Sequence, residues 1–226
     1  AYERLLNEAM SLIVQIQAAT PAAFDMNSVA SRLRFDAEKL GWELNYFKEH
    51  YFGTYLQKPL SAADDEFISR EFDELAAELE TFASVLCHRD YHAANLMIDR
   101  NGKMRIIDHQ DARIGAASYD LVSLLLDRIT ELPPREWLAE KRKFFIDLRV
   151  KLGLPRLDEE EFAHQFRLQT VQRCLKAAGT FSYQSVVRGK TYFVPFIKPM
   201  LRMACRSSES LGRFPEIRRI FGTGCE

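Results

Sequence analysis

Residues 85–98 read VLCHRDYHAANLMI. Two apolar segments flank a polar loop that carries two histidines, an arginine, an aspartate and an asparagine. The apolar flanks bury the ends of the loop, and buried polar groups cost free energy unless they are paired. The loop therefore either braces a turn or holds groups that take part in chemistry.

This loop leads into a predicted β-hairpin. The segments NLMID (95–99) and KMRIID (103–108) form two short strands around a turn that contains Asn-Gly, the strongest short-range hairpin signal. An antiparallel hairpin returns the chain to its starting end, so Asn95 and Asp108 are predicted to lie together. Asp90 is held by the loop just ahead of the first strand.

These three side chains fit a site for phosphoryl transfer. Mg²⁺ prefers oxygen ligands and needs only one or two from the protein when phosphate oxygens and water complete its shell. Asn95 and Asp108 are therefore predicted to hold Mg²⁺, and Asp90 is predicted to accept the proton of an attacking hydroxyl. One alternative is that His88, Asp90 and Asn95 only satisfy a buried turn.

A second alternative is a zinc site. It would use three histidines of this region: His88, His92 and His109. Its weakness is that the spacing of His88 and His92 suits a helix, whereas the pattern around them predicts a loop.

Helices are predicted before this region. Apolar residues at three-to-four spacing predict an amphipathic helix over residues 2–18, and an aromatic-rich helix is predicted at about 36–55. Ser61 and Asp64 form a capping box for a helix that runs to about Phe82. Three apolar residues of that helix are expected to face inward: Phe67, Leu75 and Leu79.

Helices are also predicted after the hairpin. Ser118 is expected to cap a central helix through YDLVSLLLDRI (119–129), which is apolar on nearly every side. Three more helices are expected at about 135–151, 158–178 and 191–211. Three prolines are expected to mark breaks or first turns: Pro155, Pro195 and Pro199.

Composition is that of an ordinary globular protein. The 226 residues are 47% hydrophobic and 28% charged, and no repeat or linker divides them, so one domain over residues 1–226 is expected. No parallel βαβ alternation is present, which excludes Rossmann-type folds. The net charge of −1 argues against nucleic acid as a partner.

No membrane partner is expected, because no run approaches the roughly 18 apolar residues of a membrane span. The first residues, AYERLLNEAM, lack the pattern of a signal peptide. Four cysteines show neither CxxC nor metal-ligand spacing: Cys87, Cys174, Cys205 and Cys225. They are expected to stay reduced, which favours a cytoplasmic location.

The segment HRDYHAAN (88–95) resembles the protein-kinase catalytic loop H-R-D-x-x-x-x-N, and IID (106–108) stands where D-F-G would begin. The short stretch between Gln110 and Ser118 leaves no room for an activation segment. With YDL (119–121) at the head of the central helix, the pattern resembles the aminoglycoside phosphotransferase and choline kinase superfamily, whose members phosphorylate small molecules.

This resemblance implies a role for each polar residue. Asp90 would be the catalytic base, Asn95 and Asp108 the Mg²⁺ ligands, and ATP the donor. Asp120 would support the catalytic loop, a role compatible with capping its own helix. His88 is expected to brace the loop from within.

A narrower resemblance covers most of the chain. It is to bacterial cell-wall sugar kinases, which act at the anomeric hydroxyl of N-acetylmuramate and N-acetylglucosamine. It rests on four segments: WELNYF (42–47), CHRDYHAANLM (87–97), IIDHQDARIGAASYDLVSLLLD (106–127) and VQRCLKAAGTFSYQSVVRGKTYF (171–193). The chain departs from that pattern at His109, where an aromatic residue is expected, and at Cys174, where a histidine is expected.

Four residues are candidates for binding the acceptor. Asp111 follows the hairpin and would hold a sugar hydroxyl, since carboxylates accept such hydrogen bonds well. Arg173 and Lys176 share a helix face and would meet a phosphate or the lactyl carboxylate of a muramic acid. Glu43 is the fourth candidate.

Each assignment has an alternative. For Asp111 the alternative is a salt bridge with Arg113 or Arg105. For Arg173 and Lys176 the alternative is a position on a solvated face of their helix.

Kinase folds also have a smaller lobe, with a strand-borne lysine and a glycine-rich loop that hold the nucleotide. The ten glycines include no G-x-G-x-x-G, and no strand is predicted before residue 84. The expected fold is therefore mainly α with a short β-hairpin that carries the catalytic loop. It would be the C-terminal lobe of a kinase-like fold, without its N-terminal lobe, and the isolated chain is expected to show negligible turnover.

The predicted function is ATP-dependent phosphorylation of a small-molecule hydroxyl, with an amino sugar as the favoured acceptor. Within enzymes, the alternative is an aminoglycoside, choline or amino-alcohol kinase. The alternative from another class is a non-catalytic, kinase-like scaffold. The intact set of Asp90, Asn95 and Asp108 argues against that alternative, because a scaffold does not need all three.

Overall fold

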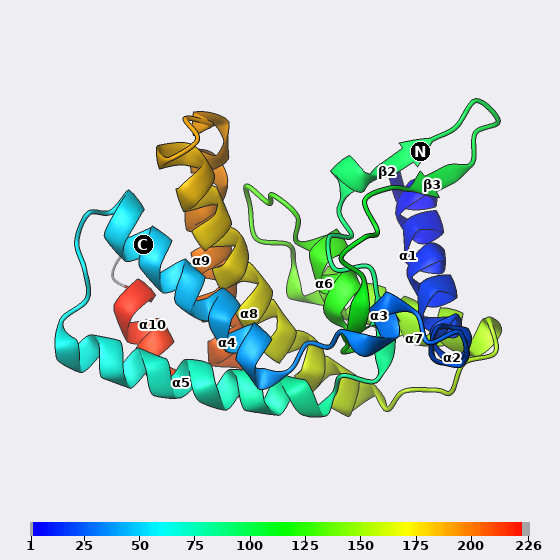
Figure 1. Ribbon diagram of the computed structural model, residues 1–226, viewed down its shortest axis with the longest axis horizontal. Helices are drawn as coiled ribbons and strands as arrows, with labels where there is room; N and C mark the ends of the chain where they lie inside the picture. The colour runs from blue at the N-terminus through cyan, green and yellow to red at the C-terminus, as the bar shows by residue number, and fades with distance from the viewer. Residues whose placement is uncertain (1, 223–226) are drawn as a thin grey trace. The chain divides into compact units, whose positions relative to one another are not determined.

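The computed structural model describes residues 2–222, and the chain is mainly helical with four short strands in that range (Figure 1). The described residues fall into two compact units. The first lies within residues 1–35, 82–127 and 133–166, and the second within 36–81, 128–132 and 167–226. The prediction of one domain stays a prediction. In the described part of the chain, no helix is both long and apolar enough to cross a membrane.

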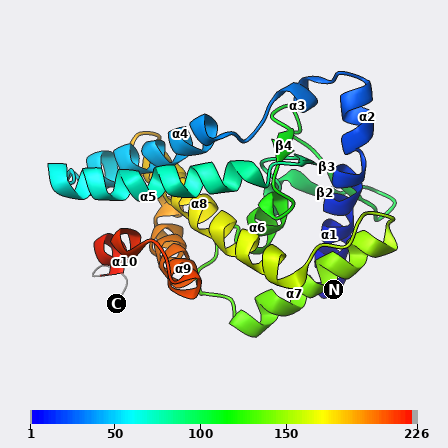
Figure 2. The same cartoon turned by 90° about the horizontal axis from the view of Figure 1, so that it is seen from below.

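The first unit contains the strands and the helices around them. Its helices are α1 (Tyr2–Ala18), α2 (Thr20–Asp25), α3 (Val29–Arg32), the 3-10 helix η2 (Ala93–Asn95), α6 (Tyr119–Leu125), α7 (Arg135–Lys151) and the start of α8 (Glu159–Val186). Helix α1 packs against α7, as Figure 2 shows, and also contacts α6. A buried glutamine, Gln17 of α1, donates to the backbone oxygen of Ala117 at 2.9 Å.

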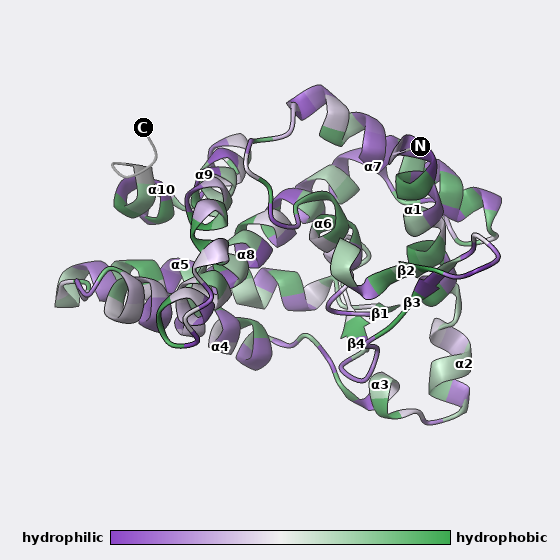
Figure 3. Cartoon of the chain, turned by 90° about the horizontal axis from the view of Figure 1, so that it is seen from above, coloured by the Kyte–Doolittle hydropathy of each residue, from purple (hydrophilic) through white to green (hydrophobic). Residues whose placement is uncertain are grey.

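Two antiparallel strand pairs hold the central loops of this unit. The predicted hairpin is confirmed as β2 (Leu96–Ile98) and β3 (Met104–Ile106), with Leu96 opposite Ile106. The turn between them is hydrophilic (purple in Figure 3). A second pair was not predicted: β1 (Val85–Cys87) lies along β4 (Arg113–Gly115), with Cys87 opposite Arg113.

Among its described residues, the second unit contains helices and the loops between them, and no strand. Its helices are α4 (Ala37–Lys48), the π-helix η1 (Glu49–Tyr55), α5 (Ala62–Thr81), the remainder of α8, the 3-10 helix η3 (Thr191–Phe193), α9 (Val194–Leu211) and α10 (Pro215–Gly222). Helix α10 packs against α5 and α9.

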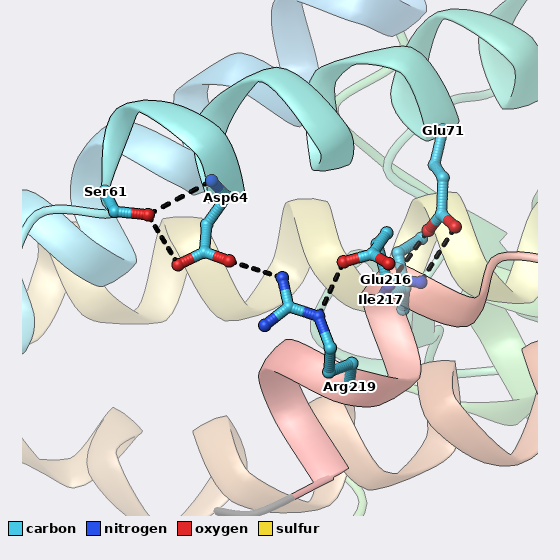
Figure 4. A network of polar contacts seen from close by, with 6 residues as sticks. All are labelled: Ser61, Asp64, Glu71, Glu216, Ile217 and Arg219. Carbon is cyan, nitrogen blue, oxygen red and sulfur yellow. Dashed lines mark hydrogen bonds and ion pairs between the residues drawn. The ribbon is translucent and has the colours of Figure 1, made fainter.

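Polar contacts fix α10 on α5 (Figure 4). The buried carboxylate of Glu71 accepts the N–H groups of Glu216 and Ile217, each at 2.8 Å. Arg219 contacts Asp64 of α5 and lies 2.6 Å from the carboxylate of Glu216. Glu71 thus satisfies backbone donors that the first turn of a helix leaves without an intrahelical partner.

Several predicted helices are confirmed. The ranges 2–18 and 135–151 match α1 and α7, and the range 36–55 corresponds to α4 with its π-helical extension. The Ser61 hydroxyl accepts the N–H of Asp64 at 3.1 Å, as a capping residue should. Leu75 and Leu79 are buried as predicted.

Phe67 does not face inward. The inward stripe of α5 consists of Ile68, Phe72, Leu75, Ala76 and Leu79, whereas Phe67 falls one position outside it and is 45% exposed. Arg70 lies over its ring, with the guanidinium carbon 5.8 Å from the ring centroid. The three-to-four periodicity of the stripe therefore excludes Phe67.

The predicted cap of α6 is also wrong. Ser118 occupies the capping position, but its backbone is helical and its side chain makes no capping hydrogen bond. Its own N–H donates to the buried Gln165 side chain at 3.1 Å. The helix ends at Leu125 rather than near 129, and Arg128 shortly beyond has a positive φ of 45°, which a right-handed helix does not allow.

Two predicted boundaries shift in the last third of the chain. Helix α8 continues past residue 178 to Val186, and residues 191–193 form a 3-10 turn before α9. Pro195 lies in the first turn of α9 and Pro155 lies between α7 and α8, as predicted. Pro199 neither breaks nor begins a helix, because it lies inside α9.

Candidate active site

The polar loop of the opening segment connects β1 to β2 and lies in the first unit. Near the start of the loop, the backbone adopts an unusual conformation: Arg89 has a φ of 82°. For a residue with a Cβ atom, this left-handed conformation costs roughly 1–2 kcal/mol. Such conformations persist only where the surroundings impose them, and they cluster at functional sites.

Asp120 imposes this conformation. Its carboxylate is fully buried at the start of α6 and accepts the N–H of His88 at 2.7 Å and that of Arg89 at 3.0 Å. A negative charge in the first turn of α6 is also favoured by the helix dipole. The start of the polar loop is thus hydrogen-bonded directly to helix α6.

Two further contacts brace the loop. The ring of His88 donates from Nε2 to the backbone oxygen of Ile107 at 3.1 Å, which ties the loop to the end of β3. Burial is the main cause that lowers the pKa of His88. The buried Tyr91 hydroxyl donates to the Ala9 oxygen at 2.7 Å, which ties the loop to α1.

The hairpin brings the ends of the two strands together. Ile107 donates its N–H to the backbone oxygen of Asn95 at 3.1 Å, and Asp108 is the next residue, with a positive φ of 67°. The Asn95 side chain is buried, and its Nδ2 donates to the backbone oxygen of Asp90 at 2.9 Å. Because its nitrogen end is used in this way, the oxygen end of the Asn95 amide is the atom available to a cation.

Asp111 forms an ion pair, but with neither of the expected arginines. Its carboxylate contacts the guanidinium of Arg89. Arg113 donates only to the Asp111 backbone oxygen at 3.3 Å, and Arg105 pairs with Asp99 at 2.8 Å. No role was predicted for Arg89, although a long cation between His and Asp in a buried loop signals a charged partner.

Three of the acceptor candidates belong to the second unit. The Glu43 carboxylate on α4 is fully buried and accepts a hydrogen bond from Gln172 of α8 at 2.9 Å. Arg173 is also buried, so the solvated-face alternative is wrong for this residue, while Lys176 is half-buried. Their role in binding an acceptor stays a prediction.

Within residues 2–222, no group of three or more His, Cys, Asp or Glu side chains is placed to hold a metal ion. Three cysteines are free, and two of them, Cys87 and Cys174, are buried. Cys225 lies outside the described residues.

Comparison with known proteins identifies the class of this chain. The profile of the phosphotransferase enzyme family, APH, matches residues 2–159. The match includes every site residue of the first unit described above. The chain belongs to this phosphotransferase family, as the resemblance in its sequence implies.

Curated relatives are N-acetylmuramate/N-acetylglucosamine kinases. The protein from Neisseria meningitidis is 31% identical over 229 residues, which cover 98% of this chain and 63% of the relative. The protein from Pseudomonas putida is 28% identical over 82% of this chain and 54% of the relative. The protein from Caulobacter vibrioides is 33% identical over 54% of this chain and 33% of the relative. The chain therefore spans less than two thirds of the length of these relatives.

Proposed function

We propose that this chain carries the catalytic groups of an ATP-dependent kinase that phosphorylates an amino sugar at its anomeric hydroxyl. The observation that supports this most strongly is the arrangement of one loop. The Asn95 side chain donates to the backbone oxygen of Asp90, and the hairpin bond from Ile107 to Asn95 brings Asp108 to the same end. Asp120 holds the start of that loop.

Asp90 is the proposed catalytic base. Its side chain is 29% exposed, so a small acceptor can reach its carboxylate. A carboxylate there can accept the proton of the acceptor hydroxyl as that oxygen attacks the terminal phosphorus of ATP. Asp120 cannot take this role, because its carboxylate is buried and already binds two backbone donors.

Asn95 and Asp108 are the proposed Mg²⁺ ligands. The donor set fits this ion, because an amide oxygen and a carboxylate are hard oxygen ligands and Mg²⁺ takes few of them from the protein. When bound there, Mg²⁺ would offset the negative charge of the phosphates. The residues of the chain supply the ligands and fix their spacing through the β2–β3 hairpin.

The acceptor is inferred from the relatives, whose names specify N-acetylmuramate and N-acetylglucosamine. Asp111, which is 51% exposed, is proposed to hold a sugar hydroxyl. In the second unit, the candidates for acceptor binding stay Arg173, Lys176 and Glu43. A nucleotide-binding lobe of the kind found in kinase-like folds is proposed to grip ATP. The cytoplasm is the proposed location, because it supplies ATP.

Phosphorus NMR with four acceptors in turn tests this function. The full natural polypeptide that contains residues 1–226 would be incubated with Mg·ATP and one acceptor at a time: N-acetylmuramate, N-acetylglucosamine, an aminoglycoside or choline. We expect a phosphate on the C1 oxygen of an amino sugar. A phosphorylated aminoglycoside or choline would overturn the acceptor, and no product from any of the four would overturn the kinase function.

Two aspartate variants connect the activity to the site. Asp90→Asn should lower kcat by roughly 100-fold or more, since a positioned base contributes about 10²–10⁴-fold. The matched control is Asp99→Asn, which changes an aspartate in the exposed turn of the same hairpin and should leave kcat within about twofold of wild type. Equal effects of the two variants would contradict the assignment of Asp90.

A further inference from the structure

Arg89 occupies a backbone position that favours glycine. Its φ of 82° is in the left-handed region, which glycine adopts freely and residues with a Cβ atom adopt at a cost. The hydrogen bonds from His88 and Arg89 to Asp120 explain how the backbone is held there. They do not explain why the residue is an arginine, since these bonds use backbone atoms only.

The side chain of Arg89 supplies the reason. It is 16% exposed, and its Nη1 contacts the carboxylate of Asp111. The same nitrogen lies 3.9 Å from the carboxylate of Asp90. One guanidinium therefore faces both the proposed base and the proposed acceptor-binding carboxylate, which lie 21 positions apart in the sequence.

We propose that Arg89 is a positioning residue, which fixes Asp90 and Asp111 relative to each other so that a bound hydroxyl meets the base. This inference rests on the proposed function. Two carboxylates that face one acceptor repel each other, and a cation between them offsets that repulsion. Guanidinium also fixes direction, because its planar fork offers several N–H donors at set angles.

The ion pair between Arg105 and Asp99, on the β2–β3 hairpin, contrasts with the Arg89–Asp111 pair. Arg105 lies 2.8 Å from Asp99, but the arginine side chain is 60% exposed. Exposed ion pairs of this kind contribute little to the stability of a folded protein. Arg105 therefore provides a matched control, which removes an arginine from an ion pair in the same unit without touching the loop.

Substitution of Arg89 by glycine separates positioning from folding. Arg89→Gly removes the backbone cost and the side chain together, so the folded protein should persist while kcat falls by about 10- to 100-fold, the scale of a misplaced reacting group. Arg89→Lys keeps the charge but loses the fork, so it should recover part of that loss. Arg105→Ala should stay within about twofold of wild type.

The measurements are kcat, the KM for ATP and the KM for the acceptor that the wild type phosphorylates, together with thermal unfolding of each variant without nucleotide. Because Arg89 acts through Asp90, the loss should appear in kcat while the KM for ATP stays unchanged. A double-mutant cycle with Asp111→Asn should give less-than-additive losses in kcat.

Three outcomes would overturn the proposal, and the last is distinguishable from the first two because it also overturns the proposed function. If the wild type phosphorylates its acceptor and Arg89→Gly matches it in kcat, the positioning role fails while the kinase function stands. The same holds if the Arg89 and Asp111 losses in kcat are strictly additive. If the wild type phosphorylates none of the four acceptors, the proposed function fails, and the role of Arg89 in it fails as well.

Discussion

Gly179 of α8 lies against the backbone of Phe47 in α4. A Cβ atom placed on Gly179 would be 2.5 Å from the Cα atom of Phe47, closer than any real contact of this kind. Seven residues earlier on α8, Gln172 donates to Glu43 of α4 at 2.9 Å. Helices α4 and α8 of the second unit are thus joined by a close backbone contact and by a buried hydrogen bond on the same side.

Gly179→Ala should destabilise the chain for this reason. The added methyl group would force the helices apart, and overpacking of this kind costs about 1–3 kcal/mol. The better helix propensity of alanine returns up to about 1 kcal/mol of that cost. Denaturant unfolding followed by circular dichroism measures the net change.

Gly41→Ala provides the control for this prediction. Gly41 is also inside a helix, α4, but a Cβ atom there would meet no other atom within 4 Å. This variant should be more stable than wild type by up to about 1 kcal/mol. If both glycine variants gained stability, the close contact with Phe47 would be refuted.

Asp120→Asn should weaken both folding and the site. The asparagine side chain can accept only one of the two N–H groups, at His88 and Arg89, that the carboxylate accepts now. Hydrogen bonds to a charged group are worth about 1.5–3 kcal/mol, so a loss of stability on that order is expected. Denaturant unfolding measures this loss of stability. We also expect kcat to fall, because the loop would no longer be held in its present geometry.

Asp99→Asn is the matched control for Asp120→Asn. Asp99 also accepts two backbone N–H groups, from Asn101 at 2.8 Å and Lys103 at 3.0 Å, but in an exposed turn. Water can replace those bonds, so the loss of stability should be smaller and kcat should be unaffected. A greater loss in the Asp99 variant would show that the Asp120 bonds do not hold the loop.

Local patterns explain what the sequence could predict. The Asn-Gly turn and the alternation around it are sufficient for the β2–β3 hairpin, and three-to-four spacing is sufficient for α1 and α7. Membership of the phosphotransferase family followed from the H-R-D loop and its spacing to Asp108, and the family match confirms it.

Features that depend on distant partners could not be predicted in this way. The β1–β4 pair joins Cys87 to Arg113, and no turn signal links them. The helix predicted at about 158–178 stops short of Gly179, whereas in the structure Gly179 lies inside α8 and permits the approach of Phe47. The partner of the Asp111 carboxylate is Arg89, because the strand pairs bring the start and the end of the site together. Of the arginines nearer in the sequence, Arg105 pairs with Asp99 and Arg113 donates to the Asp111 backbone oxygen.

The buried cysteines should resist alkylation. Burial raises the pKa of the Cys174 thiol to about 12 and raises that of Cys87 well above its usual value, and the thiolate is the reactive form. With Cys225→Ser as background, iodoacetamide at pH 8 should modify Cys205 first, since it is only half-buried. Peptide mass spectrometry measures the order, and early labelling of Cys87 or Cys174 in the folded chain would contradict their burial.

Glu71 should make folding depend on pH. Burial is the main cause that raises the pKa of this carboxyl above its usual value near 4.5, despite the N–H groups of Glu216 and Ile217 that favour its charged form. The folded chain therefore holds this proton more tightly than the unfolded chain. The stability that this contributes is complete below about pH 4.5 and is lost as the pH rises through the folded-state pKa.

The free energy of unfolding of wild type and Glu71→Gln, measured by denaturant titration from pH 4 to pH 7, tests this sign. The difference between the two proteins should move in favour of the variant as the pH rises, because glutamine does not ionise. Asp64 gives the opposite case, since its hydrogen bond with Arg219 lowers its pKa. Asp64→Asn should therefore lose stability relative to wild type as the pH rises from acid. A pH-independent difference between wild type and Glu71→Gln would show that the Glu71 proton is not bound more tightly in the folded chain.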